Sequence, residues 1–352
     1  MKETSMILAG DIGGTSVRLA FFEVAADGRL RLAAEQTYPS REYKSLDQIV
    51  TGFAAAHPLK PHHACFGIAG PVRNGTVTTP NLAWVVNSQT LAAKLGLPEV
   101  KLINDLEANA WGIAALRPGD LVTLNPGAPN AEGNAAVISV GTGLGEAGLY
   151  WDGEQHHAFA CEGGHADFAP RNDLEAELLL YLRAKFGHVS YERVLSGPGL
   201  RNVYEFLRDT GRGEEPAALA EEMRQADPSV VISRAGREGR HALCVQALDL
   251  LVSFYGAEAG SLALKMMATG GVYVGGGVAP RIIEKLKGPA FMAAFTAKGR
   301  MKPLLEAMPV RVIMNDKTAL LGAACYASRL ASAGIRSRIQ ISTFPSAGQR
   351  DP

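Results

Sequence analysis

Two observations on this chain of 352 residues predict an α/β fold. Apolar strands alternate with segments of helical spacing along most of the sequence, which is the pattern of sheets covered by helices. A strand, a glycine turn with a threonine and a second strand open the chain at 6–24, and the same layout returns at 135–151. The recurrence indicates an internal duplication, and the length favours two domains over one core.

The first hundred residues are mostly strands. Apolar runs predict strands at 6–9, 17–24, 29–37, 63–68 and 100–103. The pair Asp27-Gly28 supplies the turn before the third strand. Helical spacing predicts a helix over 46–56, and the strand at 100–103 runs directly into the helical segment NDLEANAWGIAAL.

The second half is mostly helical. The pattern predicts helices through most of 174–268, and the long apolar run at 242–267 predicts a buried central helix. VYVGGGVAP at 272–280 predicts a strand, a glycine turn and a helix. A last strand is predicted at 310–314 and a final helix at 317–330. The segment 331–352 has no hydrophobic period, and we expect it to be disordered.

Composition excludes several classes of protein. Hydrophobic residues make up 47% and charged residues 20%, which is typical of a soluble globular protein. Lys and Arg number 35, as do Asp and Glu, so no net charge favours nucleic acid or a membrane surface as a partner. The N-terminal apolar run is too short for a signal peptide, and no run approaches the roughly 20 apolar residues of a membrane span. Four cysteines without CxxC spacing indicate reduced thiols, so we expect a cytoplasmic location.

Three glycine turns end apolar strands: DIGGT at 11–15, GTGLG at 141–145 and VGGG at 274–277. Glycine permits positive φ and lets a ligand approach successive backbone N–H groups, which form an anion site. Thr15 and Thr142 add hydroxyl donors. Each turn alone is more simply a hairpin corner, but three of them together favour a bound nucleotide.

Asp11 is unexpected in a phosphate-binding turn, because a carboxylate repels phosphate. Mg²⁺ between the two groups would remove the repulsion, since Mg²⁺ takes oxygen ligands and usually keeps several waters. Asp11 therefore predicts a magnesium ion beside the nucleotide.

Two other nucleotide motifs are excluded. Gly143, Gly145 and Gly148 fit GxGxxG, but a strand and hairpin follow this turn, whereas a dinucleotide site needs a helix there. No GxxxxGK[ST] occurs in the sequence.

Asn104 and Asp105 lie where a predicted strand meets a predicted helix. In the simplest interpretation Asp105 is the N-cap of that helix. The alternative is a general base, which contributes about 10² to 10⁴ in rate where it reaches the proton it removes. Asn81 in TTPNLAW and Glu192 in SYERVLSGPG predict nothing when taken alone.

Glu162 and His165 in CEGGHADFAP flank two glycines, so both side chains could converge on one small polar ligand. A metal site is the alternative, since His156, His157 and Cys161 lie close to His165 in the sequence. Their spacing matches no established zinc pattern, and the segment lacks paired cysteines. We therefore favour ordinary surface or core histidines at 156 and 157.

Eight motifs in order give the sequence a resemblance to a known family. They are DIGGT, GIAGPV, PNLAW, LINDLEANAWG, VGTGLG, EGGHADF, ERVLSGPG and VYVGGGVAP, and the match spans about residues 6–327. Together they resemble the bacterial glucokinases of the sugar-kinase superfamily. The resemblance implies an actin-like (ribonuclease H-like) fold of two domains with the active site in the cleft between them. The small domain would hold 1–110 plus 315–330 and the large domain 111–314.

The resemblance also implies ATP-dependent phosphorylation of D-glucose at its 6-hydroxyl by a homodimer. Asp105 would be the general base, and the remaining sugar-binding residues would be Asn81, Asn104, Glu162, His165 and Glu192. Asp11 would face the Mg²⁺ ion through water. The residues around ATP would be Gly13, Gly14 and Thr15 on one side, Gly141, Thr142 and Gly143 on the other, and Gly275, Gly276 and Gly277 near the adenosine.

One departure narrows the family. The branch known as ROK carries a cysteine-rich zinc motif after its Glu-Gly-His segment, and this chain has DFAPRND there, which favours the zinc-free branch. A kinase for fructose, mannose or an N-acetylated amino sugar remains an alternative. A sugar-responsive regulator is disfavoured for two reasons. Such regulators usually carry a DNA-binding domain before the first strand, whereas here that strand begins at Met6, and Asp105 indicates an active kinase. Glu146, directly after GTGLG, has no role in the resemblance.

Overall fold

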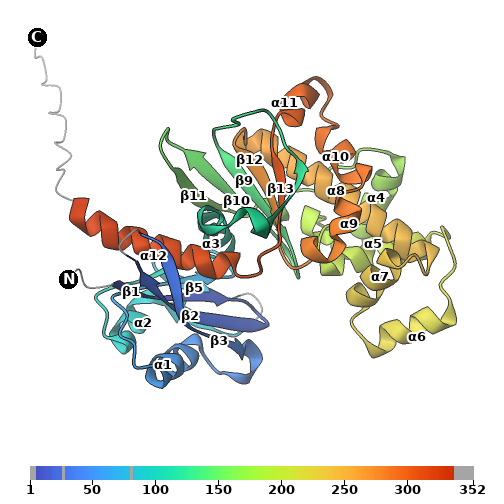
Figure 1. Cartoon of the computed structure of the whole chain (residues 1–352). Coiled ribbons are helices and arrows are strands. Elements are labelled where there is room, and N and C mark those ends of the chain that lie inside the picture. The colour runs from blue at the N-terminus through green and yellow to red at the C-terminus, as the bar shows by residue number, and fades with distance from the viewer. Residues whose placement is uncertain (1–4, 26–27, 80–81, 337–352) are drawn as a thin grey trace, which may run out of the picture.

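The computed structural model describes residues 5–25, 28–79 and 82–336. Its elements form two larger sheets, a two-stranded hairpin and the helices that cover them (Figure 1). The α/β class predicted from the sequence is confirmed. The predicted Asp27 turn and Asn81 lie outside the described residues.

The first sheet has five strands in the order β3-β2-β1-β4-β7. Their bounds are β1 Ser5–Ile12, β2 Ser16–Val24, β3 Leu30–Pro39, β4 His63–Ile68 and β7 Val100–Asn104. Strands β1, β2 and β3 are antiparallel, whereas β1, β4 and β7 run parallel. All five strands predicted in this part of the sequence are therefore present.

Side chains of β1 alternate between two cores, as the period of a strand requires. Leu8 and Ile12 pack on the face covered by α1 (Leu46–Ala56) and α2 (Ser88–Leu95). Ile7 and Ala9 pack on the opposite face, against α3 (Asp105–Gly112) and α12 (Thr318–Arg336). Figure 1 shows α12, the last helix of the chain, lying along the sheet of the first strands.

The second sheet has six strands in the order β11-β10-β9-β12-β13-β8. Their bounds are β8 Leu121–Asn125, β9 Ala135–Val140, β10 Leu144–Trp151, β11 His156–Cys161, β12 Gly271–Gly275 and β13 Val310–Ile313. Strands β10 and β11 form the hairpin that excluded a dinucleotide fingerprint, so that interpretation is confirmed. The edge strand β8 was missed by the sequence analysis.

Five strands of each sheet share one topology, and the repeated strand–turn–strand layout seen in the sequence is present in both. In each, a hairpin is followed by two parallel strands added beside its first strand: β1-β2 with β4 and β7, and β9-β10 with β12 and β13. DIGGT and GTGLG occupy the corresponding turns of the two hairpins.

Helices cover one face of the second sheet and form the largest core of the molecule. They are α4 Asp173–Phe186, α5 Gly197–Asp209, α6 Ala217–Gln225, α7 Pro228–Arg237, α8 Ala242–Met266, α9 Ile283–Leu286, α10 Pro289–Thr296 and α11 Lys302–Glu306. The remaining strands, β5 Thr76–Thr78 and β6 Val85–Asn87, form the small hairpin. Helix α8 is long and apolar enough to cross a membrane, but 67% of its most apolar window is buried inside the fold, as expected for the predicted central helix.

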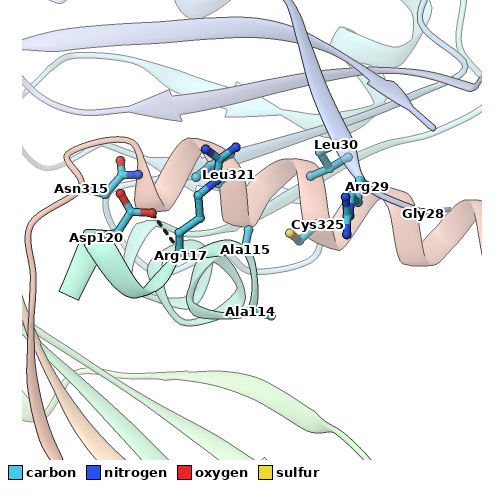
Figure 2. A pocket seen from close by; sticks show the side chains of 10 residues that line it. All are labelled: Gly28, Arg29, Leu30, Ala114, Ala115, Arg117, Asp120, Asn315, Leu321 and Cys325. Atoms are coloured by element: carbon cyan, nitrogen blue, oxygen red, sulfur yellow. Dashed lines mark hydrogen bonds between the residues drawn. The ribbon is translucent and has the colours of Figure 1, made fainter.

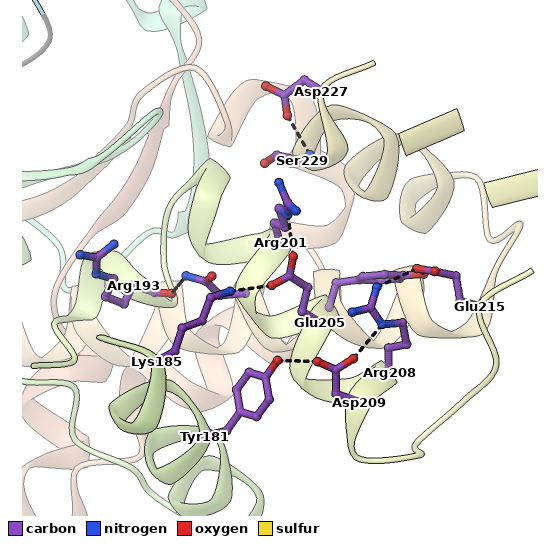
Figure 3. Close-up of polar contacts among 12 residues, drawn as sticks. Tyr181, Lys185, Arg193, Arg201, Glu205, Arg208, Asp209, Glu215, Asp227 and Ser229 are labelled. Carbon is purple, nitrogen blue, oxygen red and sulfur yellow. Dashed lines mark hydrogen bonds and ion pairs between the residues drawn. The ribbon is translucent and has the colours of Figure 1, made fainter. Parts of the chain in front are cut away.

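Polar contacts between α4 and α5 lie on the outside of this helical layer (Figure 3). Lys185 Nζ donates to Glu205 Oε2 at 2.8 Å, and the Tyr181 hydroxyl donates to Asp209 Oδ2 at 2.6 Å. Exposed pairs of this kind contribute at most about 1 kcal/mol each, so the apolar core is the main source of stability here.

One predicted boundary was wrong. The final helix does not end at residue 330, because α12 continues to Arg336. Residues 331–336 were assigned to the disordered tail because they lack a clear apolar period, but an Ala- and Ser-containing segment can still extend an existing helix. The rest of the predicted tail, 337–352, lies outside the described residues.

Candidate active site

The DIGGT turn joins β1 to β2, and hydrogen bonds from Ser40 stabilise it. Gly13 N donates to Ser16 O at 3.0 Å, which closes the hairpin. Ser40 Oγ donates to Gly13 O at 2.8 Å, and Ser40 N donates to Thr15 O at 3.0 Å. The predicted hairpin corner is confirmed, and the side chain of Thr15 remains exposed for a ligand.

The GTGLG turn joins β9 to β10 and is held by the segment around Glu192. Gly197 N donates to Gly141 O, and Gly141 N donates to Gly143 O, both at 2.9 Å. A Cβ on Gly143 would lie 2.5 Å from Glu192 Oε2, whereas a Cβ on Gly141 would meet open space. Neither glycine has a positive φ, so close approach rather than backbone conformation is the reason for glycine at 143.

The VGGG turn lies directly beside the GTGLG turn. Gly276 has φ +82°, and a Cβ there would overlap Val140 O, so only glycine fits. Val278 N donates to the same Val140 carbonyl at 3.0 Å. The buried Tyr255 hydroxyl lies 2.7 Å from Gly275 O and 3.2 Å from Ile138 O, which fixes the ends of β12 and β9 together. Two of the three predicted glycine turns are thus brought side by side.

Asn104, not Asp105, is the N-cap of α3, which corrects the simplest interpretation of the sequence. Asn104 Oδ1 accepts from Leu106 N at 2.8 Å and from Glu107 N at 3.3 Å. Asn104 Nδ2 donates to Gly70 O at 3.2 Å, and the same side chain bonds to the Asp105 carboxylate, which lowers the pKa of Asp105. Asp105 is the first helical residue, and its Oδ1 accepts from Leu106 N at 3.0 Å, so the two residues share that donor while Asn104 also accepts from Glu107 N.

Helix α3 lies between the two sheets. Ala108 packs in the core of the first sheet, whereas Ala110 packs with Val137 and Ala147 of the second. Leu106, the residue after Asp105, packs against Gly145 so closely that a Cβ there would overlap the leucine side chain. This contact fixes Asp105 relative to the GTGLG turn.

The carboxyl groups around Asp105 perturb one another. Burial raises the pKa of Asp105, hydrogen bonding to Leu106 N opposes this, and the charge of Glu162 raises it further. Burial raises the pKa of Asp11 to about 6, and the charge of Asp105 adds to the effect. DIGGT, Asp105 and Glu162 therefore meet in one electrostatic environment, although they are far apart in the sequence.

The Glu162–His165 segment lies against the strand that follows GTGLG. A Cβ on Gly164 would overlap Leu144 O, so this 3-10 turn needs glycine to pack on β10. The side chains of Glu162 and His165 are exposed. Glu192 Oε2 accepts from Leu144 N at 3.0 Å. The predicted sugar-binding residues Glu162, His165 and Glu192 thus gather around the start of β10.

The two other histidines of this region have partners elsewhere. His156 Nε2 lies 2.9 Å from Gly133 O, and His157 Nε2 lies 2.6 Å from Asp152 Oδ2. Within residues 5–25, 28–79 and 82–336, no group of three His, Cys, Asp or Glu side chains is placed to hold a metal ion.

Two charged residues near Asp11 were missed by the sequence analysis. Arg18 is the cross-strand partner of Asp11 in the β1–β2 pairing. Its guanidinium forms an ion pair with Asp316 Oδ2 at 3.0 Å. The hairpin register offered a signal for Arg18, because a turn at Gly13-Gly14 places residues 11 and 18 opposite each other. No local pattern indicated Asp316.

A cavity of about 730 Å³ lies elsewhere, where α12 meets the turns that follow α3 (Figure 2). Arg117, Asp120, Asn315 and Cys325 contribute to its lining. None of the predicted site residues lines this cavity, so it is separate from the candidate active site.

Comparisons with known proteins agree with the arrangement of these segments. A family model described as Glucokinase matches residues 8–330. A glucokinase from Nostoc sp. strain PCC 7120 is 42% identical over 341 residues, covering 93% of this chain and 100% of the relative. The crystal structure of a glucokinase from an Antarctic psychrotroph is similar with a TM-score of 0.79 and 31% identity, covering 93% of this chain and 100% of that one.

A more distant structure, a ROK family glucokinase from Streptomyces griseus in complex with glucose and AMPPNP, has a TM-score of 0.62 at 21% identity. It covers 92% of this chain and 100% of that one, and at this identity it supports the fold alone. The fold is the actin-like two-domain fold of the sugar kinases, as predicted. On the family model and the 42% identity, the chain belongs to the glucokinase family.

Proposed function

We propose that this chain transfers the γ-phosphoryl group of ATP to the 6-hydroxyl of D-glucose, with Asp105 as the general base. Phosphorylation of glucose by ATP follows from the family. What we propose beyond the family is the role of each residue, the transfer to the 6-hydroxyl and the use of a magnesium ion. Its main support is the position of Asp105, which follows the N-cap Asn104 and lies in one electrostatic environment with Asp11 and Glu162.

Asp105 is suited to take a proton late in the reaction. A sugar hydroxyl has a high pKa, so the base accepts its proton as the bond to phosphorus forms rather than before. The pKa of Asp105 is raised by burial, which makes its carboxylate a stronger proton acceptor. Phosphoryl transfer otherwise requires mainly positioning and charge stabilisation.

The sugar would be held by groups around the start of β10, of which Glu162 and His165 are exposed and Glu192 is partly buried. Glu162, His165 and Glu192 supply acceptors and a donor on that side, and the amide of Asn104, which lies beside Asp105, would donate to the sugar when it is bound. Asn81 completes this proposed set. Because these groups come from separate segments, glucose itself would help to order them.

The nucleotide would lie between the two corresponding hairpin turns. Gly13, Gly14 and Thr15 present backbone N–H groups and a hydroxyl from the first sheet, and Gly141, Thr142 and Gly143 do so from the second. The turn of Gly275, Gly276 and Gly277, which lies beside GTGLG, would contact the adenosine. Glucose and ATP as the two substrates follow from membership of the glucokinase family.

The residues around Asp11 fit a magnesium ion. The carboxyl is half-buried, and its pKa is raised to about 6 by burial and by Asp105, with Asp316 adding to the effect. A cation at this position would relieve that repulsion. Since the described residues supply no group of three ligands, Asp11 would hold Mg²⁺ through water. The bound ion would neutralise charge on the phosphates.

Three further proposals rest on the family or on composition. We propose a homodimer, a cytoplasmic location, and a domain boundary near residue 110 with α12 returning to the small domain. The last is supported by the packing of α12 on β1 and β4. Light scattering of the purified protein tests the oligomer.

The substrate is tested by a coupled assay over a panel of hexoses with ATP, ADP and polyphosphate as donors. We expect glucose with Mg²⁺ and ATP to give the highest kcat/KM. A higher value for fructose, mannose or an N-acetylated amino sugar would replace glucose as the substrate, and sugar binding without turnover would support a regulator.

A further inference from the structure

Glu146, for which the family resemblance gave no role, is deeply buried beside the sugar-binding segment. It lies on β10 with 1% of its surface exposed. Within the described part of the chain, neither of its carboxyl oxygens has a hydrogen-bond partner. A buried carboxylate without a partner is strongly disfavoured, so this group needs either a proton or a cation.

Glu258 on α8 lies within hydrogen-bonding reach of Glu146, and its charge raises the pKa of Glu146. It is 0% exposed, and its Oε1 accepts from Lys265 Nζ at 2.9 Å. Its Oε2 has no partner among the residues that the structure describes. Two buried carboxyl groups therefore share one directly paired cation. A proton on one of them satisfies the oxygens that lack a partner, because it lets one carboxyl donate to the other.

Two other cations lie near the pair, but their hydrogen bonds and ion pairs go to other groups, so neither satisfies the oxygens of Glu146. Lys298 Nζ donates to Ala257 O and to Ser261 Oγ, both at 2.9 Å, and burial lowers the pKa of its ammonium group. Arg171, which lies close enough to affect Lys298, is paired with the carboxylate of Glu175 at 2.6 Å.

Two neutral groups complete the surroundings. Burial raises the pKa of the Cys161 thiol on β11, and the charges of Glu146 and Glu162 raise it further. Burial raises the pKa of Tyr191 to about 12, and the charge of Glu258 adds to this. Neither group offers a positive charge to the pair.

The pair lies directly beneath both sugar-binding segments. A Cβ on Gly163 would overlap Glu146 Oε2, so the carboxyl touches the residue after Glu162. Glu146 is also the cross-strand partner of Cys161, the residue before Glu162. On the other side, Tyr191 contacts Glu258 and precedes Glu192. The pair therefore contacts residues adjacent to both Glu162 and Glu192.

We propose that Glu146 and Glu258 form a carboxylic acid–carboxylate pair with one shared proton, and that Glu146 is a positioning residue that sets the sugar affinity by supporting Glu162–His165. The inference rests on the proposed function, because it takes Glu162 and His165 as sugar-binding residues. Glu146 does not touch the substrate and is not a catalytic residue.

A pH dependence follows from this arrangement. Burial raises the pKa of Glu146 to about 8, and the charge of Glu258 adds to the effect while Lys265 opposes it. The stability that the neutral carboxyl contributes is therefore complete below its ordinary pKa of 4.5 and is lost as the pH rises through about 8. Loss of the proton puts a second negative charge beneath Gly163, and the segment must move to admit water.

The test is glucose binding by calorimetry without ATP, from pH 6.5 to pH 9, for the wild type and for Glu146→Gln. The amide imitates the neutral carboxyl in shape but cannot ionise. We expect the wild-type affinity to fall over this range by a factor at least threefold larger than that of E146Q. Comparing the two proteins removes the contribution of His165, which both retain. Glu154→Gln, an exposed change on the same hairpin, should keep the wild-type pH dependence.

A second readout detects the proton itself. The infrared spectrum of the wild type at pH 7 should contain the C=O stretch of a protonated carboxylic acid, absent from E146Q and present in E154Q. An equal pH dependence of binding in wild type and E146Q, or a wild-type spectrum without this band, overturns the inference. Glu162→Gln distinguishes failure of the proposed sugar site from failure of the shared proton. If this variant binds glucose as tightly as the wild type, the proposed sugar site is wrong. The infrared spectrum still decides whether Glu146 and Glu258 share a proton.

Discussion

Leu106 of α3 packs directly against Gly145 of β10, so the residue after the proposed base touches the strand that follows the GTGLG turn. The contact joins the helix that begins beside the first sheet to a strand of the second sheet. It explains why glycine is needed at 145, where φ is unexceptional but no space remains for a side chain. The position of the base relative to the phosphate-binding turn therefore depends on a close apolar contact.

Gly145→Ala tests this relationship. The added Cβ overlaps Leu106, so we expect kcat/KM for glucose to fall at least tenfold, because a small displacement of Asp105 is costly in phosphoryl transfer. Leu106→Ala in the same chain should restore much of the loss by making space. Steady-state kinetics of the two single variants and the double variant give the coupling, and we expect at least about 1 kcal/mol between contacting residues. Additive effects would contradict the proposed contact.

Asp105→Asn removes the base and keeps the shape of the side chain. We expect kcat to fall by a factor of about 10² to 10⁴, which is the usual contribution of a general base. Glucose binding measured by calorimetry should weaken by only a few fold, since Glu162, His165 and Glu192 remain. A variant that keeps a tenth or more of the wild-type kcat would show that Asp105 is not the base.

Sequence patterns predicted most of the sheets because each strand carries its own local signal. The apolar runs at 63–68 and 135–140 and the glycine turns that end them are visible in a few consecutive residues. Strand β8 was missed because Leu121–Asn125 is a short edge strand in which no residue is fully buried, so its pattern does not stand out from a loop.

The sequence predicted only those site residues that lie in recognisable motifs. Asp105 was identified as a candidate from its place at a strand–helix junction, but the sequence could not distinguish cap from base, because either Asn104 or Asp105 satisfies a free helix end. Glu258 was not predicted at all. It is one carboxyl in an apolar helix, and only the tertiary packing places it against Glu146, more than a hundred residues away in the chain.

Asp11→Asn should change how stability depends on pH. Because burial and Asp105 raise the pKa of Asp11 to about 6, its stabilising contribution is complete below pH 3.8 and is lost as the pH rises through about 6. We therefore expect the Tm of the variant, measured without metal, to rise relative to the wild type between pH 4 and pH 6.5. A constant Tm difference across this interval would show that Asp11 titrates normally. The variant should also need more Mg²⁺ for half-maximal activity.

Metal removal separates the two metals considered for this chain. We expect EDTA to abolish activity without lowering the Tm of the protein, and excess Mg²⁺ to restore the rate. A zinc-selective chelator should change neither the rate nor the Tm, because His156 and His157 already bond to Gly133 and Asp152. Unfolding on zinc removal would mean that the segment 156–165 holds a structural ion.

Asn104→Ala tests whether capping and catalysis are divided between neighbouring residues. The change removes the acceptor for Leu106 N and Glu107 N, so we expect a loss of about 1 kcal/mol in unfolding free energy, as for other N-caps. Asn104→Asp keeps the acceptor and should restore that stability in denaturant titrations. It should not restore glucose affinity, because a carboxylate lacks the amide N–H that we assign to the sugar. If N104D recovers both stability and affinity, Asn104 acts only as the cap, and Asp105 alone of this pair touches the substrate.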